Sequence, residues 1–182
     1  MTDNPLFFDT DCISAFLWVD ETSIVTKLYG NNVMIPKQVY NELSACTGVG
    51  VVLKQRIDLM IKNGEASIVD MESDSSEYSL FSSLAINVPE GQKVIGKGEA
   101  ACIALAKERN GILASNNLYD IKIYIEKYGL KHTTTADILV DAYDNKLLSE
   151  DEIEKVWADM LARRRQIGAK TFSDYLTQVG RT

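Results

Sequence analysis

The sequence predicts one α/β domain built around a central, mainly parallel sheet of about five strands. Short apolar runs alternate with longer amphipathic stretches along the chain. Apolar runs joined by helices in this way indicate right-handed crossovers between parallel strands. The chain has 182 residues, of which 46% are hydrophobic and 25% charged, as in an ordinary globular protein. A domain of this length buries roughly 70% of its surface, so it needs no metal ion or disulfide for stability.

Each expected strand is a short apolar run that ends at a polar or turn residue. The first run stops at Asp9, and the second stops at Pro36, which also suits the first turn of a helix. The fourth run follows Asn110-Gly111, a typical helix stop. The five expected strands are Leu6–Phe8, Val33–Ile35, Ala66–Val69, Ile112–Ala114 and Leu130–Thr133.

Amphipathic stretches fill the intervals between these runs and predict helices. Thr135 is placed to cap one of them, and Ser149 with Glu152 forms the capping box of a long C-terminal helix. The least regular segment is 71–97, where a helix is expected from the serines at 73–76 to Leu84, before a loop over 89–98. The other expected helices span about 12–19, 22–29, 37–45, 51–62, 99–109, 118–128, 136–144, 149–166 and 172–179.

No linker or internal repeat divides the chain. We expect residues 1–148 to form the α/β domain and residues 149–182 to form a helical extension packed on it. Met1–Leu6 contains Asp3 but no lysine or arginine, unlike the start of a signal peptide. No window of about 18 apolar residues could span a membrane. We therefore expect a cytoplasmic protein that has no membrane partner.

Charge and rare residues exclude several kinds of site. The net charge is −7, so the field of the whole molecule repels nucleic acid, and a nucleic-acid contact needs a local basic patch or bound cations. The three cysteines form no C-x-x-C pair, which argues against a disulfide framework or a zinc knuckle. A single histidine, His132, excludes zinc sites built on several histidines. Any chemistry must therefore depend on carboxylates.

Acidic and amide side chains follow three of the expected strands. In a parallel α/β sheet, ligands bind outside the carboxyl ends of the strands. Asp9 ends the first strand, Glu42 lies in the helix after the second, and Glu99 begins the helix after Gly98. Asn116 and Asn117 follow the fourth strand, and Asp120 comes one helical turn later.

These motifs resemble those of PIN domains, over about residues 6–165. The family begins with an apolar strand that runs into Asp-Thr, as in Asp9-Thr10. A later strand of the family normally ends in an acidic pair such as Thr-Asp-Asp, where this chain has Ser115-Asn116-Asn117. The remaining matches are Pro36, Val39, Glu42 and Leu43 in one helix, and Gly98-Glu99-Ala100 with Ile103-Ala104-Leu105-Ala106 in another.

The resemblance implies a three-layer α/β/α sandwich and an activity. Members of the family are mostly metal-dependent ribonucleases, and many are VapC-like toxins of toxin–antitoxin pairs. For this chain it implies an endoribonuclease that uses Mg²⁺ or Mn²⁺, acts on RNA, and could bind an antitoxin or form a homodimer. By position, the catalytic and metal-binding residues would be Asp9, Glu42 and Glu99, with Asp120 as a further metal ligand. The pocket would be lined by Thr10, Asp11, Ser115, Asn116 and Asn117.

The asparagine pair departs from the family pattern. An asparagine offers a carbonyl oxygen but no charge, so weaker metal binding is expected. This leaves an alternative function, a catalytically decayed PIN fold that binds nucleic acid or a protein partner. The acids also have simpler interpretations, since Asp9 or Asp11 could cap a helix, and Glu99 suits the dipole of a helix start.

One dense basic run could contact nucleic acid. It consists of Arg163, Arg164 and Arg165, with Lys170 close by in the sequence. Basic residues near the C-terminus of a helix also complement its dipole, and that interpretation stays open.

Overall fold

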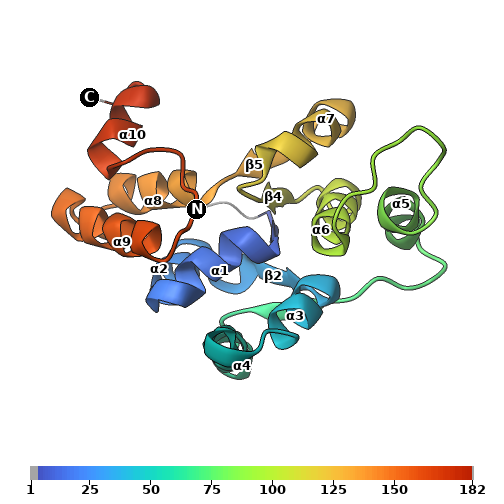
Figure 1. Ribbon diagram of the computed structural model, residues 1–182, viewed down its shortest axis with the longest axis horizontal. Coiled ribbons are helices and arrows are strands. Elements are labelled where there is room, and N and C mark those ends of the chain that lie inside the picture. Colours follow the sequence, from blue (N-terminus) through green and yellow to red (C-terminus); the bar gives the residue numbers. More distant parts are fainter. Residues whose placement is uncertain (1–3, 182) are drawn as a thin grey trace.

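The computed structural model describes residues 4–181 and contains a five-stranded parallel sheet (Figure 1). Met1, Thr2, Asp3 and Thr182 lie outside the described residues, and so does the first half of Met1–Leu6, the segment unlike a signal peptide. The strand order is β3-β2-β1-β4-β5, and every neighbouring pair is parallel. The strands are β1 (Leu6–Phe8), β2 (Val33–Pro36), β3 (Ser67–Val69), β4 (Ile112–Ala114) and β5 (Lys131–Thr133).

Strand β1 occupies the centre of the sheet, and its three side chains are completely buried. Leu6 is in register with Val33 on one side and with Ile112 on the other. A continuous apolar run suits a strand that is covered on both faces, which is why Leu-Phe-Phe forms the middle of a parallel sheet. The parallel sheet predicted from the sequence is confirmed.

Helices cover both faces of the sheet in a three-layer α/β/α sandwich, as predicted. They are α1 (Thr10–Val19), α2 (Thr22–Tyr29), α3 (Lys37–Ser44), α4 (Val51–Lys62), α5 (Ser76–Ala85), α6 (Lys97–Glu108), α7 (Leu118–Tyr128), α8 (Thr135–Asp144), α9 (Glu150–Ala162) and α10 (Phe172–Gln178). Helix α6 packs on β1, β2 and β4, and α5 covers α6. Helix α1 packs against α3, α4, α8 and α9. In Figure 1, α5 to α7 lie on one side of the molecule and α8 to α10 on the other.

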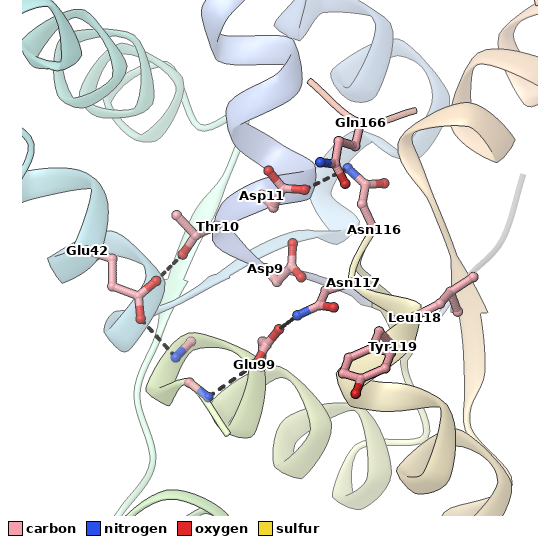
Figure 2. Close-up of a pocket in the computed structure, with 12 residues that line it drawn as sticks. Asp9, Thr10, Asp11, Glu42, Glu99, Asn116, Asn117, Leu118, Tyr119 and Gln166 are labelled. Carbon is pink, nitrogen blue, oxygen red and sulfur yellow. Dashed lines mark hydrogen bonds between the residues drawn. The ribbon is translucent and has the colours of Figure 1, made fainter. Parts of the chain in front are cut away.

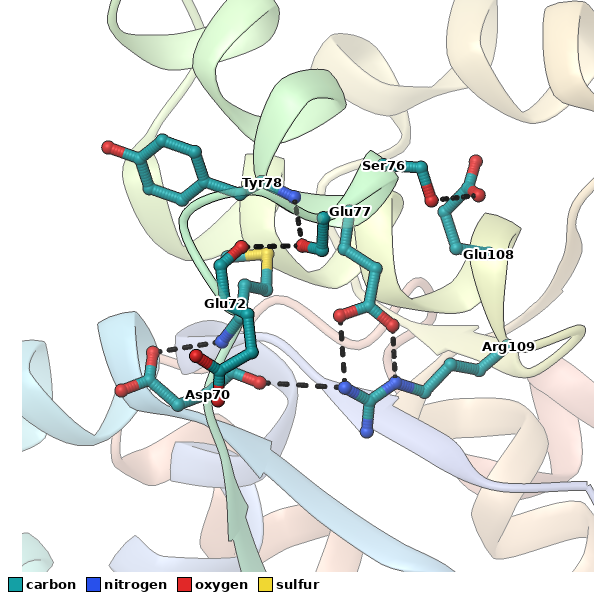
Figure 3. A network of polar contacts seen from close by, with 9 residues as sticks. Asp70, Glu72, Ser76, Glu77, Tyr78, Glu108 and Arg109 are labelled. Atoms are coloured by element: carbon teal, nitrogen blue, oxygen red, sulfur yellow. Dashed lines mark hydrogen bonds and ion pairs between the residues drawn. The ribbon is translucent and has the colours of Figure 1, made fainter.

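A network of charged side chains fixes the segment that looked least regular in the sequence (Figure 3). The guanidinium of Arg109 donates to both carboxylate oxygens of Glu77, at 2.6 and 3.0 Å. The hydroxyl of Ser76 donates to Glu108 at 2.6 Å. Because Arg109 and Glu108 end α6 while Ser76 and Glu77 begin α5, these bonds hold the two helices side by side.

The C-terminal helices pack on the same sandwich. Helix α9 contacts α1 and α8, and α10 packs on α9. Trp157 is fully buried, and its ring lies 5.7 Å from that of Phe172 and 5.5 Å from that of Tyr175, measured between centroids. None of the helices in residues 4–181 has the length and apolar character needed to cross a bilayer.

Two helix ends differ from those expected. Thr134, rather than Thr135, caps α8, because its hydroxyl accepts from the Asp137 amide at 3.1 Å. Helix α9 ends at Ala162, not near Gln166. There Arg164 adopts a left-handed φ of 59°, and the amide of Arg165 donates to the carbonyl of Met160 at 3.0 Å. This Schellman turn stops the helix although no glycine marks the position.

A substitution at Gly111 tests the packing of β1. A Cβ at this position would lie 2.5 Å from the Phe7 ring and 2.7 Å from the Pro5 carbonyl oxygen. We expect Gly111→Ala to lower the free energy of unfolding by about 1–3 kcal/mol, as overpacking does, when measured by chemical denaturation.

The neighbouring Asn110 provides the control. Its φ of 49° is a conformation that glycine adopts freely, so Asn110→Gly should change the stability by less than about 0.5 kcal/mol. Equal stabilities for the Gly111→Ala and wild-type proteins would contradict this account of β1.

Candidate functional site

A cavity of about 480 Å³ opens where the carboxyl ends of β1, β2 and β4 meet. Figure 2 shows the side chains around it, which come from α1, α3, α6 and the segment after β4. The structure therefore brings together residues that are more than a hundred positions apart. Of the site residues predicted from the sequence, those that line the cavity are Asp9, Thr10, Asp11, Glu42, Glu99, Asn116 and Asn117.

Asp9 is the most deeply buried acid of the site, with 2% of its surface exposed. Its backbone amide continues the sheet by donating to the Ala114 carbonyl at 2.9 Å. Its carboxylate caps α1 by accepting from the Cys12 amide at 2.7 Å. Burial, together with the smaller effect of the neighbouring charges of Asp11 and Glu99, raises the pKa of Asp9 to about 7, although the hydrogen bonds from Ser115 and Cys12 lower it. The capping role and the site position are thus compatible.

Glu42 is held by two donors from other elements. Its carboxylate accepts from the hydroxyl of Thr10 and from the backbone amide of Gly98, the latter at 3.0 Å. A Cβ at position 98 would lie 2.9 Å from one carboxylate oxygen. Glycine at this position therefore lets α6 approach Glu42 closely enough to orient it.

Glu99 lies in the first turn of α6, where its carboxylate is shared between two partners. One oxygen accepts from the backbone amide of Gly96 at 3.2 Å. The other accepts from the side-chain amide of Asn117 at 2.5 Å. The dipole of α6 favours a negative charge at this end, so Glu99 serves both the helix and the cavity.

Asn117 bridges two acids that the sequence assigned to the metal site. Its side-chain amide donates to Glu99 and, at 2.9 Å, to the carboxylate of Asp120. Asp120 also forms an ion pair with Lys93, which lowers its pKa. The structure places Asp120 in a neighbouring cavity and not in the one around Asp9.

Asn116 joins β4 to α8. Its carbonyl oxygen accepts from the backbone amide of Thr135 at 2.8 Å, and its amide group donates to the hydroxyl of the same residue at 2.9 Å. The amide group also lies 3.5 Å from a carboxylate oxygen of Asp11. Ser115 is fully buried beside Asp9, and its hydroxyl oxygen accepts from the backbone amide of Asn117 at 3.3 Å.

The basic run divides at the end of α9. The guanidinium of Arg163 lies 5.9 Å from the centroid of the Trp18 ring, whereas Arg165 points to the site and reaches Asp11 at 3.5 Å. Arg164 and Lys170 are exposed, and neither lines the cavity. Among these four basic residues, only Arg165 contacts an acid of the site.

Sequence reasoning did not assign five of the lining residues to the site. They are Gly96, Gly98, Leu118, Tyr119 and Gln166. A signal was present for Gly98, which belongs to the Gly-Glu-Ala motif. Gln166 was missed because the early end of α9 could not be predicted, and it is this turn that brings residue 166 to the cavity.

The donor set around the cavity matches the chemistry of a hard divalent cation. All the side-chain donors are carboxylate, hydroxyl or amide oxygens, which Mg²⁺ and Mn²⁺ prefer. Clustered acids around a buried carboxylate also create a negative site that a cation would neutralise. Within residues 4–181, however, no three acidic, histidine or cysteine side chains gather closely enough to hold one ion. Glu42 and Glu99 each accept hydrogen bonds from donors on the cavity wall.

Comparison with known proteins gives one match. The model of a family described as a PIN domain matches residues 6–181, nearly the whole chain. The searches of curated proteins and of solved structures found no match.

Gly98→Ala tests how the cavity orients Glu42. The new methyl group would displace the Glu42 carboxylate, while alanine is favoured over glycine in a helix by about 1 kcal/mol. We therefore expect the metal-free protein to keep its stability or gain slightly in thermal denaturation. Mn²⁺ affinity, measured by calorimetry, should fall about tenfold, as when a group that orients a metal ligand is lost. An unchanged Mn²⁺ affinity would show that this contact does not prepare Glu42 for a cation.

Proposed function

The chain belongs to the PIN-domain family, and from that premise we propose that it is a divalent-metal-dependent endoribonuclease. The observation that carries the proposal is the position of Asp9, Glu42 and Glu99 around one cavity at the carboxyl ends of the strands. These acids come from three separate segments, the end of β1, helix α3 and helix α6, which the fold brings together.

The three acids would hold Mg²⁺ or Mn²⁺. When bound, such an ion supplies an activated water and a positive charge for the departing oxygen of a phosphodiester. Asp9 provides a buried carboxyl group at the end of a central strand, and a bound cation would favour its ionised form. Glu42 and Glu99 are pre-oriented by the amides of Gly98 and Gly96. Arg165, beside Asp11, offers a guanidinium to the phosphate at the edge of the site.

The biological setting we propose is that of a toxin in the cytoplasm. The setting follows from the family resemblance, since many PIN domains are the toxins of toxin–antitoxin pairs. A net charge of −7 would suit a basic segment of an antitoxin, and homodimers fit the same setting. Cys12, Cys46 and Cys102 are free thiols, as is usual in a reducing compartment.

A second function is favoured by the contacts of Asn117. Its amide group stands between Glu99 and Asp120 and stabilises both carboxylates without a cation. A site that is satisfied in this way could have lost catalysis while keeping the fold. The protein would then bind nucleic acid or a protein partner.

Asp9→Asn separates the two functions. We expect the wild-type protein to cleave single-stranded RNA with Mn²⁺ and not with a chelator, and the variant to lose about a hundredfold or more of this activity. Asparagine still caps α1 but carries no charge, so the metal-free variant should be more stable by about 0.5–2 kcal/mol. Cleavage is followed on a labelled oligonucleotide, and stability by thermal denaturation.

Asp74→Asn is the matched control, because Asp74 is exposed and lies outside the cavity. It should change neither cleavage nor stability. If wild-type protein with Mn²⁺ leaves RNA intact, the decayed fold becomes the better description.

Asn117→Asp tests whether the uncharged amide of Asn117 lowers the affinity of a metal site. The substitution adds a carboxylate next to Glu99 with little change of shape, so Mn²⁺ affinity should rise about tenfold. Without metal, the variant loses the two hydrogen bonds donated to Glu99 and Asp120 and gains repulsion. Its free energy of unfolding should fall by about 1–3 kcal/mol.

Asn116→Asp provides the comparison for this calorimetric titration. Its carbonyl oxygen already accepts from Thr135, so we expect a smaller gain in Mn²⁺ affinity there. Equal affinities for the wild-type protein and both variants would remove the asparagines from any metal site.

A further inference from the structure

A second cavity, of about 610 Å³, lies directly beside the acidic one. One wall is the segment before α6, with Lys93 and Ile95. The other wall is α7, with Tyr119, Ile123, Tyr124 and Lys127. Tyr119, which Figure 2 shows at the first cavity, lines both cavities, so the two adjoin at this residue.

The α7 wall presents an aromatic and apolar surface to the solvent. Tyr119 is 90% exposed and Ile123 is 66% exposed. Tyr119, Ile123 and Lys127 are spaced four residues apart, which places them on one face of the helix. Tyr119 and Ile123 therefore lie outside the core of the domain, and the exposed Tyr119 ring is accessible to a flat ligand.

The same cavity carries two of the cations of an acidic protein. The ammonium group of Lys93 lies 4.9 Å from the centroid of the Tyr119 ring and is paired with Asp120. Lys127 stands one turn beyond Ile123 on the opposite edge of the wall. Against a net charge of −7, these lysines make the cavity locally suitable for a phosphate.

We propose that this cavity binds an unpaired base and phosphate of single-stranded RNA, next to the phosphodiester that enters the acidic cavity. The inference rests on the proposed ribonuclease function and adds a base-binding subsite to it. An aromatic ring stacks on any base, and flanking lysines contact the backbone, which is the usual mode for single strands. Because Tyr119 lines both cavities, a base stacked on its ring would lie next to the scissile phosphodiester in the acidic cavity. A paired base would have no free face for the ring, so the site selects single strands.

Binding of a short labelled RNA, measured by fluorescence anisotropy in a chelator, tests the proposal without cleavage. Tyr119→Ala should weaken binding about five- to one-hundred-fold, the range expected for one stacked base. Tyr119→Phe keeps the ring and should stay within about twofold of the wild-type protein. The same RNA annealed to its complement should bind more weakly than the single strand. Because Tyr119 is almost fully exposed, its loss should leave the fold intact, which circular dichroism checks.

Lysine variants on α7 provide a matched pair. Lys127→Gln should weaken binding and lower the slope of affinity against salt concentration by about one. Lys122→Gln removes the same charge from the same helix, but Lys122 does not line the cavity, so binding should be unchanged.

The outcomes separate this inference from the proposed function. Equal RNA affinity for the wild-type and Tyr119→Ala proteins overturns the base cavity, even if RNA is cleaved with Mn²⁺. Weaker binding by Tyr119→Ala in a protein that never cleaves RNA supports the cavity and rejects the ribonuclease. Equal losses for Lys127→Gln and Lys122→Gln, or no RNA binding by the wild-type protein, also overturn the inference and point to a peptide as the occupant.

Discussion

A carboxylate buried beside other acids is the constraint that organises the site in this structure. The parallel sheet brings Asp9, Glu42 and Glu99 to one edge, and Asp9 is almost completely buried there. When no cation is bound, hydrogen bonds from neutral donors offset part of the cost of placing these charges together. The chain supplies them locally, from the Cys12 amide to Asp9, the Gly98 amide to Glu42, and the Asn117 side chain to Glu99. The glycines and the asparagine around the site are therefore part of its electrostatics.

The position of Asn117 explains how a departure from the family pattern is compatible with the fold. An acid at this position would add a charge to the cluster and increase its need for a metal ion. The amide instead donates to Glu99 and Asp120, which stabilises the metal-free protein and draws both carboxylates toward the wall. Stability without metal and affinity for metal thus oppose each other at one residue.

Local signals in the sequence were sufficient for the sheet and most helix ends. Leu6–Phe8 could be predicted as a strand because a strand buried on both faces appears in the sequence as a continuous apolar run. The start of α9 could be predicted because the capping box at Ser149 is a local pattern. The end of α9 could not be predicted, because it depends on a left-handed conformation at Arg164, and arginine rarely adopts that conformation. Asp9, Glu42 and Glu99, which line the cavity, were predicted as site residues from sequence motifs. Tyr119 and the pairing of Asp120 with Lys93 depend on how a distant loop lies against α7, which no local pattern contains.

The distribution of cations around the acidic cavity follows from these long-range contacts. Arg165 reaches Asp11 from the turn after α9, and Lys93 reaches Asp120 from the segment before α6. Both cations are held by carboxylates that flank the cavity, so the repulsive field of an acidic protein is weakest on these two sides. A polyanion would meet favourable charge on either side of the acids and unfavourable charge over them unless a metal ion is bound. Under the proposed function, Arg165 and Lys93 would hold a phosphate chain at the flanks, and a bound cation would draw it toward the acids.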